Sequence, residues 1–274
     1  MTQPFRQPIL VDFAATSADR AGARAQNFHI ERIAGPLSEP AAFGSRSEII
    51  LLLPELGATL GGHHEALLPG HALAILPAGE YHVTPKGAGA VYVLATDRTD
   101  AVPLQNKANV ASYASPDARV TPIRAYRPLA AHAGVRIYPI EEIPIPPDNG
   151  RLRFVQSETM SINWVEYDGT RDRTSLSPHA HGDLEQASLV LAGDFVHHLR
   201  TPWGRNADHW QDDVHMPAGP NSVVVIPPEI IHTTEGVGEG RHVLVDVFAP
   251  PRADFIAKGW IFNAGDYAPL VATS

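Results

Sequence analysis

The same short pattern occurs twice in the chain, each time directly after an apolar run. Residues 77–82 read Pro-Ala-Gly-Glu-Tyr-His and follow the run 72–76, and residues 227–232 read Pro-Pro-Glu-Ile-Ile-His and follow the run 222–226. Short apolar runs that end at proline are typical of buried β-strands that stop at a turn. The repeat therefore predicts two related β-domains joined in one chain.

The rest of the sequence favours the same all-β class. The chain of 274 residues contains 25 prolines and 22 glycines, which implies many turns between short strands. Further strand-like runs lie at 48–54, 90–95, 152–158, 160–167, 185–191 and 242–248. The chain has no cysteine, so disulfides, thiolate metal sites and cysteine nucleophiles are excluded.

Charge and hydropathy exclude further classes of function. The net charge is -9, with 30 acidic and 21 basic residues, so no basic surface for a nucleic acid is expected. No uncharged apolar run is long enough to span a bilayer, and the first residues do not resemble a signal peptide. With the absence of cysteine, these features predict a cytoplasmic protein that binds neither nucleic acid nor membrane.

Residues 178–193 hold a candidate metal half-site. In an extended strand His179, His181 and Glu185 would leave the backbone on one face, because side chains alternate. His232, from the second copy of the repeated pattern, supplies a third imidazole. Three neutral imidazoles and one carboxylate suit a divalent first-row metal and leave positions open for water or substrate. We therefore expect one Fe, Mn, Ni or Zn ion per chain.

These residues resemble the two sequence motifs of the cupin superfamily. The first motif is His-x-His, three or four residues, Glu, about six residues and Gly, and the second is Pro-x-Gly-x-x-His. The matching residues are His179, His181, Glu185 and Gly193 in the first motif and Pro227 and His232 in the second. Seven residues separate Glu185 from Gly193, and Glu229 stands where the second motif has glycine.

The resemblance implies two double-stranded β-helix, jelly-roll-like barrels in tandem. We expect a degenerate first barrel at 28–97, a connector at 98–150, a metal-binding second barrel at 151–250 and a tail at 251–274. Residues 1–27 have no readable role. In this reading the metal ligands converge inside the second barrel from facing strands.

The first barrel keeps too few of the motif residues to bind a metal tightly. Aligning Glu48 with Glu185 places Ala42 and Gly44 at the two histidine positions of the first motif. Small apolar side chains cannot coordinate a metal. We expect this barrel to be structural, with His82 as a hydrogen-bonded core residue.

The residues that reach the substrate depend on which strand positions face inward. Either Asn163 and Tyr167 or Trp164 and Glu166 face the pocket, and either His197 or its neighbour His198 does. Candidates for moving a proton are Tyr167, Glu166 and His197. Candidates for contacting the substrate are Trp164, Gln186, Arg153 and Trp210. The excursion that carries Trp210, at 201–217, is either a lid over the pocket or a packing loop.

Three functions are compatible with the resemblance. The first is a dioxygenase-type oxidoreductase, which would use Fe(II) and a small oxygenated or aromatic molecule. The second is a metal-dependent isomerase, lyase or decarboxylase that acts on a sugar acid or similar metabolite. The third is a non-catalytic bicupin that binds a small molecule. We favour the dioxygenase with Fe(II), because such enzymes are frequent in the family.

Different side chains would favour the first two functions. A dry, aromatic pocket suits an oxygenase, and the candidates to form one are Trp164, Phe195 and Trp210. Arginines suit a sugar acid, and the candidates to hold one are Arg153, Arg171, Arg173 and Arg200. The aromatic tail and the open edges of such barrels also predict a homodimer.

Overall fold

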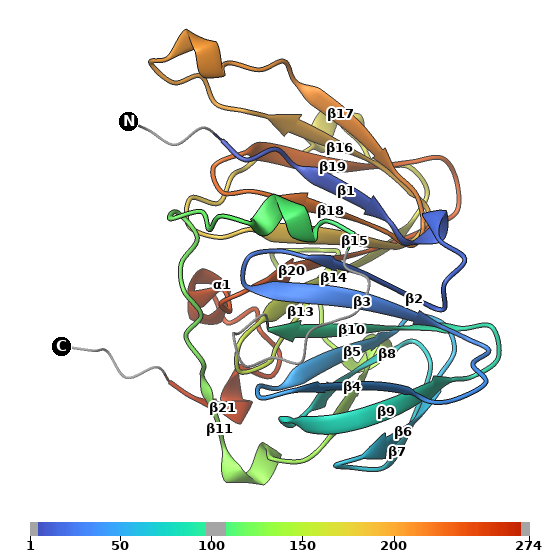
Figure 1. The fold of residues 1–274 in the computed structure, drawn as a ribbon. Coiled ribbons are helices and arrows are strands. Elements are labelled where there is room, and N and C mark those ends of the chain that lie inside the picture. The colour runs from blue at the N-terminus through green and yellow to red at the C-terminus, as the bar shows by residue number, and fades with distance from the viewer. Residues whose placement is uncertain (1–4, 97–107, 270–274) are drawn as a thin grey trace.

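The computed structural model describes residues 5–96 and 108–269, and these residues are almost entirely in strands and turns. The strands form two barrels that lie one above the other (Figure 1). Each barrel pairs a six-stranded sheet with a smaller sheet. This arrangement confirms the predicted fold class, all-β with two double-stranded β-helix barrels in tandem.

The first barrel is built from ten strands. In spatial order its six-stranded sheet contains β12 (Arg136–Pro139), β8 (Ala72–Leu76), β5 (Ile49–Leu53), β10 (Ala90–Thr96), β3 (Phe28–Ala34) and β2 (Arg20–Arg24). Its four-stranded sheet contains β4 (Ala41–Ser45), β9 (Gly79–Pro85), β6 (Ala58–Gly62) and β7 (Ala66–Leu68).

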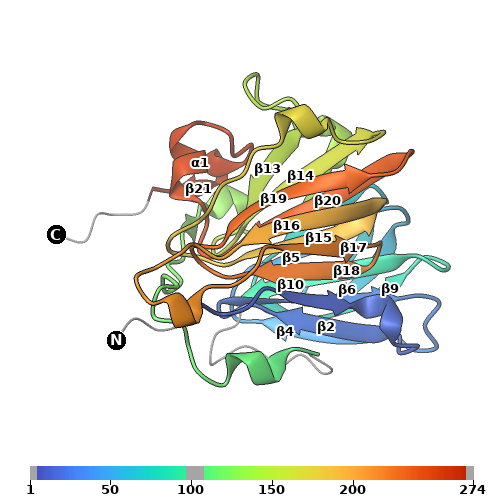
Figure 2. The same cartoon turned by 90° about the horizontal axis from the view of Figure 1, so that it is seen from above.

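The second barrel repeats this plan. Its six-stranded sheet contains β1 (Ile9–Asp12), β18 (Ser222–Ile226), β15 (Gln186–Ala192), β20 (Arg241–Phe248), β14 (Ser161–Asp168) and β13 (Leu152–Gln156). Its smaller sheet contains β17 (Val214–Ala218), β16 (Asp194–Arg200) and β19 (Ile231–Val237) and covers the larger one (Figure 1, Figure 2).

The remaining elements are short. A two-stranded sheet joins β11 (Arg127–Pro128) to β21 (Tyr267–Ala268), and α1 spans Ala253–Ala257. The described 3-10 helices are Phe13–Ala15, Val110–Tyr113, Ala130–His132, Ile140–Glu142, Arg173–Ser175, Ala207–His209 and Ala264–Asp266. Nowhere in 5–96 or 108–269 is there a helix of the length and apolarity needed to cross a bilayer.

Strand pairing crosses the expected domain boundaries in both barrels. Strand β1, which precedes the first barrel, pairs with β18 of the second, with Ile9 opposite Val225. Strand β12, from the expected connector, pairs with β8 of the first, with Arg136 opposite Ile75. Both edge strands of the first barrel's six-stranded sheet, β12 and β2, and one edge strand of the second barrel's, β1, therefore lie outside the expected ranges. The expected boundary between 97 and 98 lies outside the described residues.

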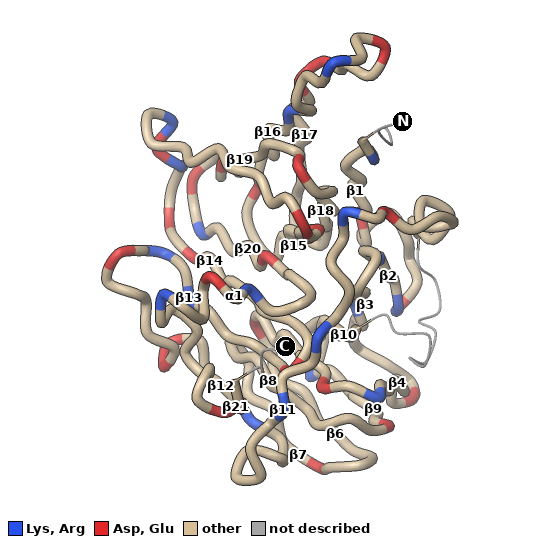
Figure 3. The backbone as a smooth tube through the Cα atoms, turned by 90° about the vertical axis from the view of Figure 1, so that its left-hand side faces the viewer, with Lys and Arg blue, Asp and Glu red and all other residues tan. Residues whose placement is uncertain are grey.

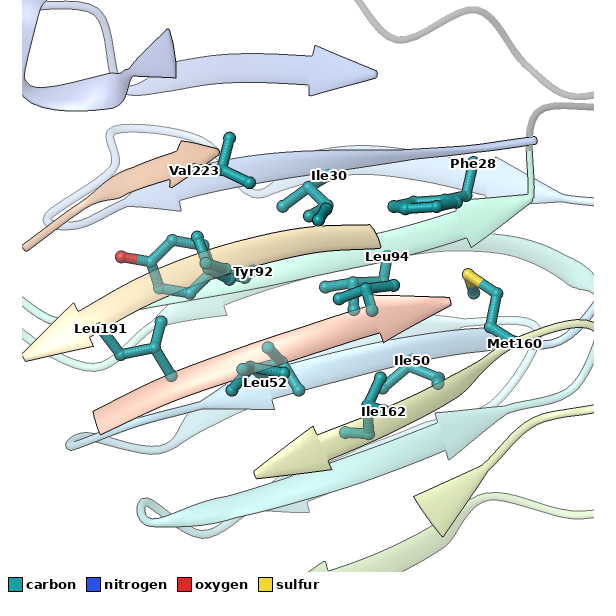
Figure 4. Packing of buried hydrophobic residues seen from close by; sticks show 14 of the residues in the cluster. Phe28, Ile30, Ile50, Leu52, Tyr92, Leu94, Met160, Ile162, Leu191 and Val223 are labelled. Atoms are coloured by element: carbon teal, nitrogen blue, oxygen red, sulfur yellow. The ribbon is translucent and has the colours of Figure 1, made fainter. Parts of the chain in front are cut away.

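The two six-stranded sheets pack against each other through one large apolar cluster. Figure 4 shows side chains from both sheets interleaved in this layer. The first barrel supplies Phe28, Ile30, Ile50, Leu52, Tyr92 and Leu94, and the second supplies Met160, Ile162, Leu191 and Val223. Because successive side chains of a strand point to opposite faces, the alternate positions point into the barrels.

The interiors of the two barrels differ. The first barrel is filled by a second apolar cluster, to which Ile49, Leu51 and Tyr81 belong. The second barrel also has an apolar cluster, with Val165 and Phe195. Polar residues of the same strand parity, among them buried Asn163 and His197, share this interior. The first barrel also buries polar side chains at inward positions, His29 and Glu31 of β3, whose register partners Ala95 and Val93 belong to its apolar cluster. In the second barrel, His197 lies on β16, which pairs with the strand that carries His232.

The aromatic residues of the tail pack mainly on their own chain. The rings of Trp260 and Phe154 lie 5.2 Å apart, and Tyr267 is buried. Phe262 is half exposed. The loop between β16 and β17 projects beyond the second barrel (Figure 3).

Candidate metal centre

Three histidine side chains meet inside the second barrel. His179 and His232 face each other across an antiparallel bridge, and their ring centroids are 4.5 Å apart. The ring of His181 lies 5.0 Å from that of His179 and 5.3 Å from that of His232. One nitrogen of each ring lies within 4.8 Å of the other two, so a single ion can contact all three.

Backbone carbonyls orient two of these rings. The Nδ1 of His179 donates to the carbonyl oxygen of Ser177, and the Nδ1 of His232 donates to that of Ile230, both at 2.9 Å. A neutral imidazole with its proton on Nδ1 keeps a lone pair on Nε2. This is the tautomer in which a metal-binding histidine uses Nε2.

The buried rings are neutral at physiological pH. Burial, reinforced by the charge of Arg252, lowers the pKa of His181 to about 3. Burial and the neighbouring His179 lower the pKa of His232 to about 4. Unprotonated imidazoles are the form that binds a metal.

Glu185 does not join the three histidines, and its expected role as the fourth ligand is wrong. Its carboxylate accepts hydrogen bonds from the backbone N–H of Gln26 at 2.5 Å and the hydroxyl of Tyr113 at 3.0 Å, and Arg6 lies 3.5 Å away. The segment after His181 bends before β15 begins, so it is not one continuous strand. The parity counted from the histidines is therefore lost before Glu185.

Gln186 takes the place that was expected for Glu185. Its Oε1 lies 3.0 Å from the Nε2 of His181 and 3.1 Å from the Nε2 of His232. Its Nε2 donates to Asp246 Oδ1 at 2.8 Å and to the hydroxyl of Ser188 at 3.0 Å, which fixes the orientation of the amide. The motif spacing was also compatible with Gln186, because four residues separate His181 from Gln186 and six separate Gln186 from Gly193.

The contact between Gln186 and His232 tests whether a cation fits this group. The proton of His232 is on Nδ1, so its Nε2 and the Oε1 of Gln186 are both acceptors, yet they face each other at 3.1 Å. Two acceptors at this distance repel unless a positive charge lies between them. The three histidines and Gln186 thus fit a divalent metal.

The loop before His232 holds a strained residue at the position where the motif has glycine. Glu229 has φ of 69°, in the left-handed region that glycine adopts without cost. Its N–H donates to the carbonyl of His181 at 2.6 Å, which ties this loop to the first half of the site. The turn therefore keeps the glycine-type geometry without glycine.

A pocket of about 130 Å³ opens beside the ligands. Its walls include Tyr167, Phe195, Thr234, Asp246, Arg151 and Arg171. Burial and the charge of Arg171 lower the pKa of Arg151, whose guanidinium lies 5.6 Å from the ring centroid of Tyr167. Neither arginine forms an ion pair with a residue in the described ranges. The pocket therefore has two arginines without an ion-pair partner among the described residues and one acidic wall residue, Asp246, which is hydrogen-bonded to Gln186 and Ser188.

The strand β14 presents its odd-numbered positions to this pocket. Trp164 and Glu166, candidates for substrate contact and proton transfer, face the other barrel instead: Trp164 Nε1 donates to Glu166 Oε2 at 2.9 Å, and His71 reaches the same oxygen at 3.0 Å. Burial alone would raise the pKa of Glu166, but hydrogen bonds from His71, Trp164 and Arg241 lower it to about 2. Both residues join the barrels, and Tyr167 is the candidate that lines the pocket.

His197 faces inward and His198 faces outward. His197 is fully buried, its Nδ1 lies 3.0 Å from the hydroxyl of Thr234, and burial lowers its pKa to about 3. His197 does not line the pocket itself but contacts Thr234, which does. Its Nε2 has no hydrogen-bond partner among the residues that the structure describes.

Two expected substrate contacts lie away from the pocket. Arg153 Nε donates to the carbonyl of Ile143 at 3.1 Å, on the face opposite to the pocket. Trp210 is half exposed and stacks on Trp203, with ring centroids 4.7 Å apart. The prediction that Arg153 and Trp210 line the pocket is therefore wrong. Arg151, which the sequence analysis did not identify as a candidate, lines the pocket instead.

The arrangement of two barrels is the cupin fold. No protein-family model matches the chain, and no curated protein matches it. Among solved structures, the chain is similar to a point mutant of oxalate decarboxylase from Bacillus subtilis, with a TM-score of 0.56 and 13% identity over 88% of this chain and 77% of that chain. A second oxalate decarboxylase structure has a TM-score of 0.56 and 11% identity over 92% and 79%. A deletion mutant of the Bacillus subtilis enzyme has 0.55 and 14% over 89% and 78%.

Proposed function

We propose that the protein is a metal-dependent cupin enzyme that acts on a small carboxylate. The metal would be a divalent transition ion bound by His179, His181, His232 and Gln186. The contact between acceptor atoms at Gln186 and His232 carries this proposal, because a cation is what makes it favourable. Imidazole and amide donors are compatible with iron, manganese, nickel or zinc.

The substrate class follows from the charge of the pocket. Arg151 and Arg171 lie at the same pocket as the candidate ligands and lack acidic partners in the described parts of the chain. A guanidinium binds a carboxylate through two parallel hydrogen bonds. The solved structures that share the fold are of a decarboxylase named for a small dicarboxylate, which supports the same choice.

These observations favour the lyase, decarboxylase or isomerase class over the dioxygenase. Of the three aromatic residues considered for an oxygenase pocket, Trp164 faces the other barrel and Trp210 lies outside, so only Phe195 lines the wall. A dioxygenase with Fe(II) is the second candidate, since Phe195 and Leu244 give part of the pocket an apolar surface.

The chain's own residues would bind and orient the substrate. A bound divalent ion would act as a Lewis acid toward a substrate oxygen. Arg151 and Arg171 would hold the carboxylate at the pocket, and Asp246 would keep the Oε1 of Gln186 turned toward the histidines. Burial raises the pKa of Tyr167, so its phenol keeps its proton and can donate it or a hydrogen bond to the substrate.

Metal analysis combined with two assays tests the proposal. Protein purified anaerobically without chelator is analysed for metal and then assayed for carbon dioxide release and oxygen uptake with small carboxylates, sugar acids, catechols and diketones. About one metal ion per chain and turnover of a carboxylate without oxygen uptake are expected. Oxygen uptake that depends on substrate would favour the dioxygenase. Absence of metal would return the protein to the non-catalytic binding class.

We also propose a homodimer and a cytoplasmic location, on the aromatic tail and the cysteine-free composition respectively. The exposed Phe262 and the stacked pair Trp203 and Trp210 offer apolar surface for a partner. Light scattering at micromolar concentration tests the dimer, and a monomeric mass would contradict it.

A further inference from the structure

The outer face of the smaller sheet in the second barrel carries a separate group of ionisable side chains. His198 of β16, His215 of β17 and Glu235 of β19 lie on neighbouring strands, with His198 directly opposite His215 in the strand register. The Nδ1 atoms of His198 and His215 are 2.8 Å apart. The Nε2 of His198 lies 2.9 Å from Glu235 Oε2. None of these residues takes part in the centre described above.

Glu235 determines where the free lone pair of His198 points. A carboxylate only accepts, so the Nε2 of His198 carries the proton that it donates to Glu235. The Nδ1 of a neutral His198 is then an acceptor, and it is directed at the Nδ1 of His215. A histidine that donates one ring N–H to a carboxylate and turns its other nitrogen outward has the arrangement of a metal ligand.

We propose that His198 and His215 bind a second divalent transition-metal ion through their Nδ1 atoms, with Glu235 orienting His198. Two nitrogens bound to the same zinc ion are about 3.3 Å apart at tetrahedral angles. To admit the ion, the two Nδ1 atoms would separate by about 0.5 Å, the rings would turn so that both lone pairs point at the ion, and His215 would carry its proton on Nε2. The exposed side chain of His215 can make this adjustment.

The surroundings leave room for the rest of the coordination shell. His198 and His215 line a pocket of about 240 Å³ together with Asp213. The carboxylate of Asp213 also lines this pocket but is paired with Arg200 at 2.5 Å, so water would supply the remaining ligands. Two imidazole donors select zinc, copper or nickel rather than calcium.

Zinc binding is measured by titration calorimetry in a variant that lacks the first centre, H179A/H181A. We expect this variant to bind one zinc ion per chain. Adding H198A/H215A should weaken the binding at least tenfold, and adding E235Q should weaken it by roughly 10-fold or more, as loss of an orienting carboxylate does elsewhere. The metal content of the first centre in otherwise native protein should stay unchanged by H198A/H215A.

The first barrel offers a matched control. His63 and His64 also form a close pair, with ring centroids 4.7 Å apart against 4.9 Å for His198 and His215. The double variant H63A/H64A removes the same number of imidazoles and should leave the zinc titration unchanged. An equal loss in this control, or no zinc binding in H179A/H181A, would overturn the proposal. If H198A/H215A does not fold, the single variant H215A replaces it, and retained binding there would also overturn the proposal.

Discussion

The two barrels share one strand plan and differ in what fills them. Phe43 faces Tyr81 across β4 and β9 in the first barrel, as His179 faces His232 in the second. The aromatic pair stacks with ring centroids 5.9 Å apart, within the apolar cluster of this barrel. An apolar pair is therefore enough to build this part of the barrel. The histidines of the second barrel are not required by the fold, which favours a chemical role for them.

This register corrects the alignment of the two motifs. Ala42 and His82 lie opposite each other, but on the outer face of their sheet, one residue out of step with the interior pair Phe43 and Tyr81. His82 is exposed, so its expected place in the core is wrong. The first barrel presents no histidine at the position of His232.

In contrast to the histidines, the buried glutamates Glu48 and Glu185 have similar environments in the two barrels. Glu48 accepts hydrogen bonds from the hydroxyl of Tyr267 at 2.7 Å and the N–H of Glu158 at 2.8 Å, and it pairs with Arg136 at 2.5 Å. Glu185 has the same three kinds of partner: a tyrosine, a backbone amide and an arginine. The two glutamates are structurally equivalent, and both join separate segments of the chain.

The largest expected effect is the loss of metal from the second barrel alone. In a background that also lacks the surface pair, H198A/H215A, the double variant H179A/H181A removes two ligands, so bound metal measured by elemental analysis should fall to background. The variant H82A should keep the content of native protein, because His82 faces solvent. Metal loss in H82A would show that the first barrel is also occupied.

Replacing Gln186 by alanine tests whether Gln186 or Glu185 is the fourth ligand. Q186A removes the Oε1 that faces His181 and His232, so metal affinity measured by competition with a chelator should drop by roughly tenfold or more. E185Q should leave the affinity unchanged, since the carboxylate of Glu185 faces Gln26 and Tyr113. The reverse result would restore Glu185 as a ligand.

Removal of either buried glutamate should lower the free energy of unfolding without changing metal content. E48A and E185A each leave a buried arginine without its nearest carboxylate, although Arg136 keeps a longer contact with Asp266 at 3.5 Å. Breaking a buried pair costs about 3 kcal/mol. Urea denaturation followed by circular dichroism measures this loss. A clear difference between the two variants would contradict the equivalence of Glu48 and Glu185.

Acid should weaken the contact between the barrels. The pKa of Glu166 is lowered from 4.5 to about 2 in the folded chain, so its stabilising contribution is complete above pH 4.5 and is lost as the pH falls toward 2. Thermal unfolding between pH 2 and 6 measures this dependence. E166Q should flatten the curve over that range, and an unchanged slope would show that Glu166 does not contribute.

The smallest expected effect concerns the left-handed residue in the turn before His232. E229G places glycine at φ of 69° and should raise the free energy of unfolding by about 1 kcal/mol or less. The half-exposed pair of Glu229 with Arg119 contributes little that would be lost. A lower melting temperature in E229G would show that this pair outweighs the strain.

The all-β class, the two barrels and the convergence of His179, His181 and His232 were readable from strand patterns and motif spacing. The fourth ligand was misassigned because a bend after His181 changes the parity, and spacing alone allowed Glu185 or Gln186. The inward face of β14 was unreadable for another reason. Trp164 is buried between the two barrels, and its neighbours on the strand are buried inside the second barrel. Because both faces of β14 are buried, its sequence does not alternate between apolar and polar residues, and the alternation cannot identify the inward face.

The crossed edge strands have a consequence for the order in which the protein folds during synthesis. Strand β1 is synthesised more than 200 residues before its partner β18. Until then its backbone groups pair with water or with a wrong edge. The second barrel therefore closes only after β18 has been synthesised, through a contact of very long range, and such contacts form slowly. Cutting the chain between the barrels would leave each of them without one edge strand.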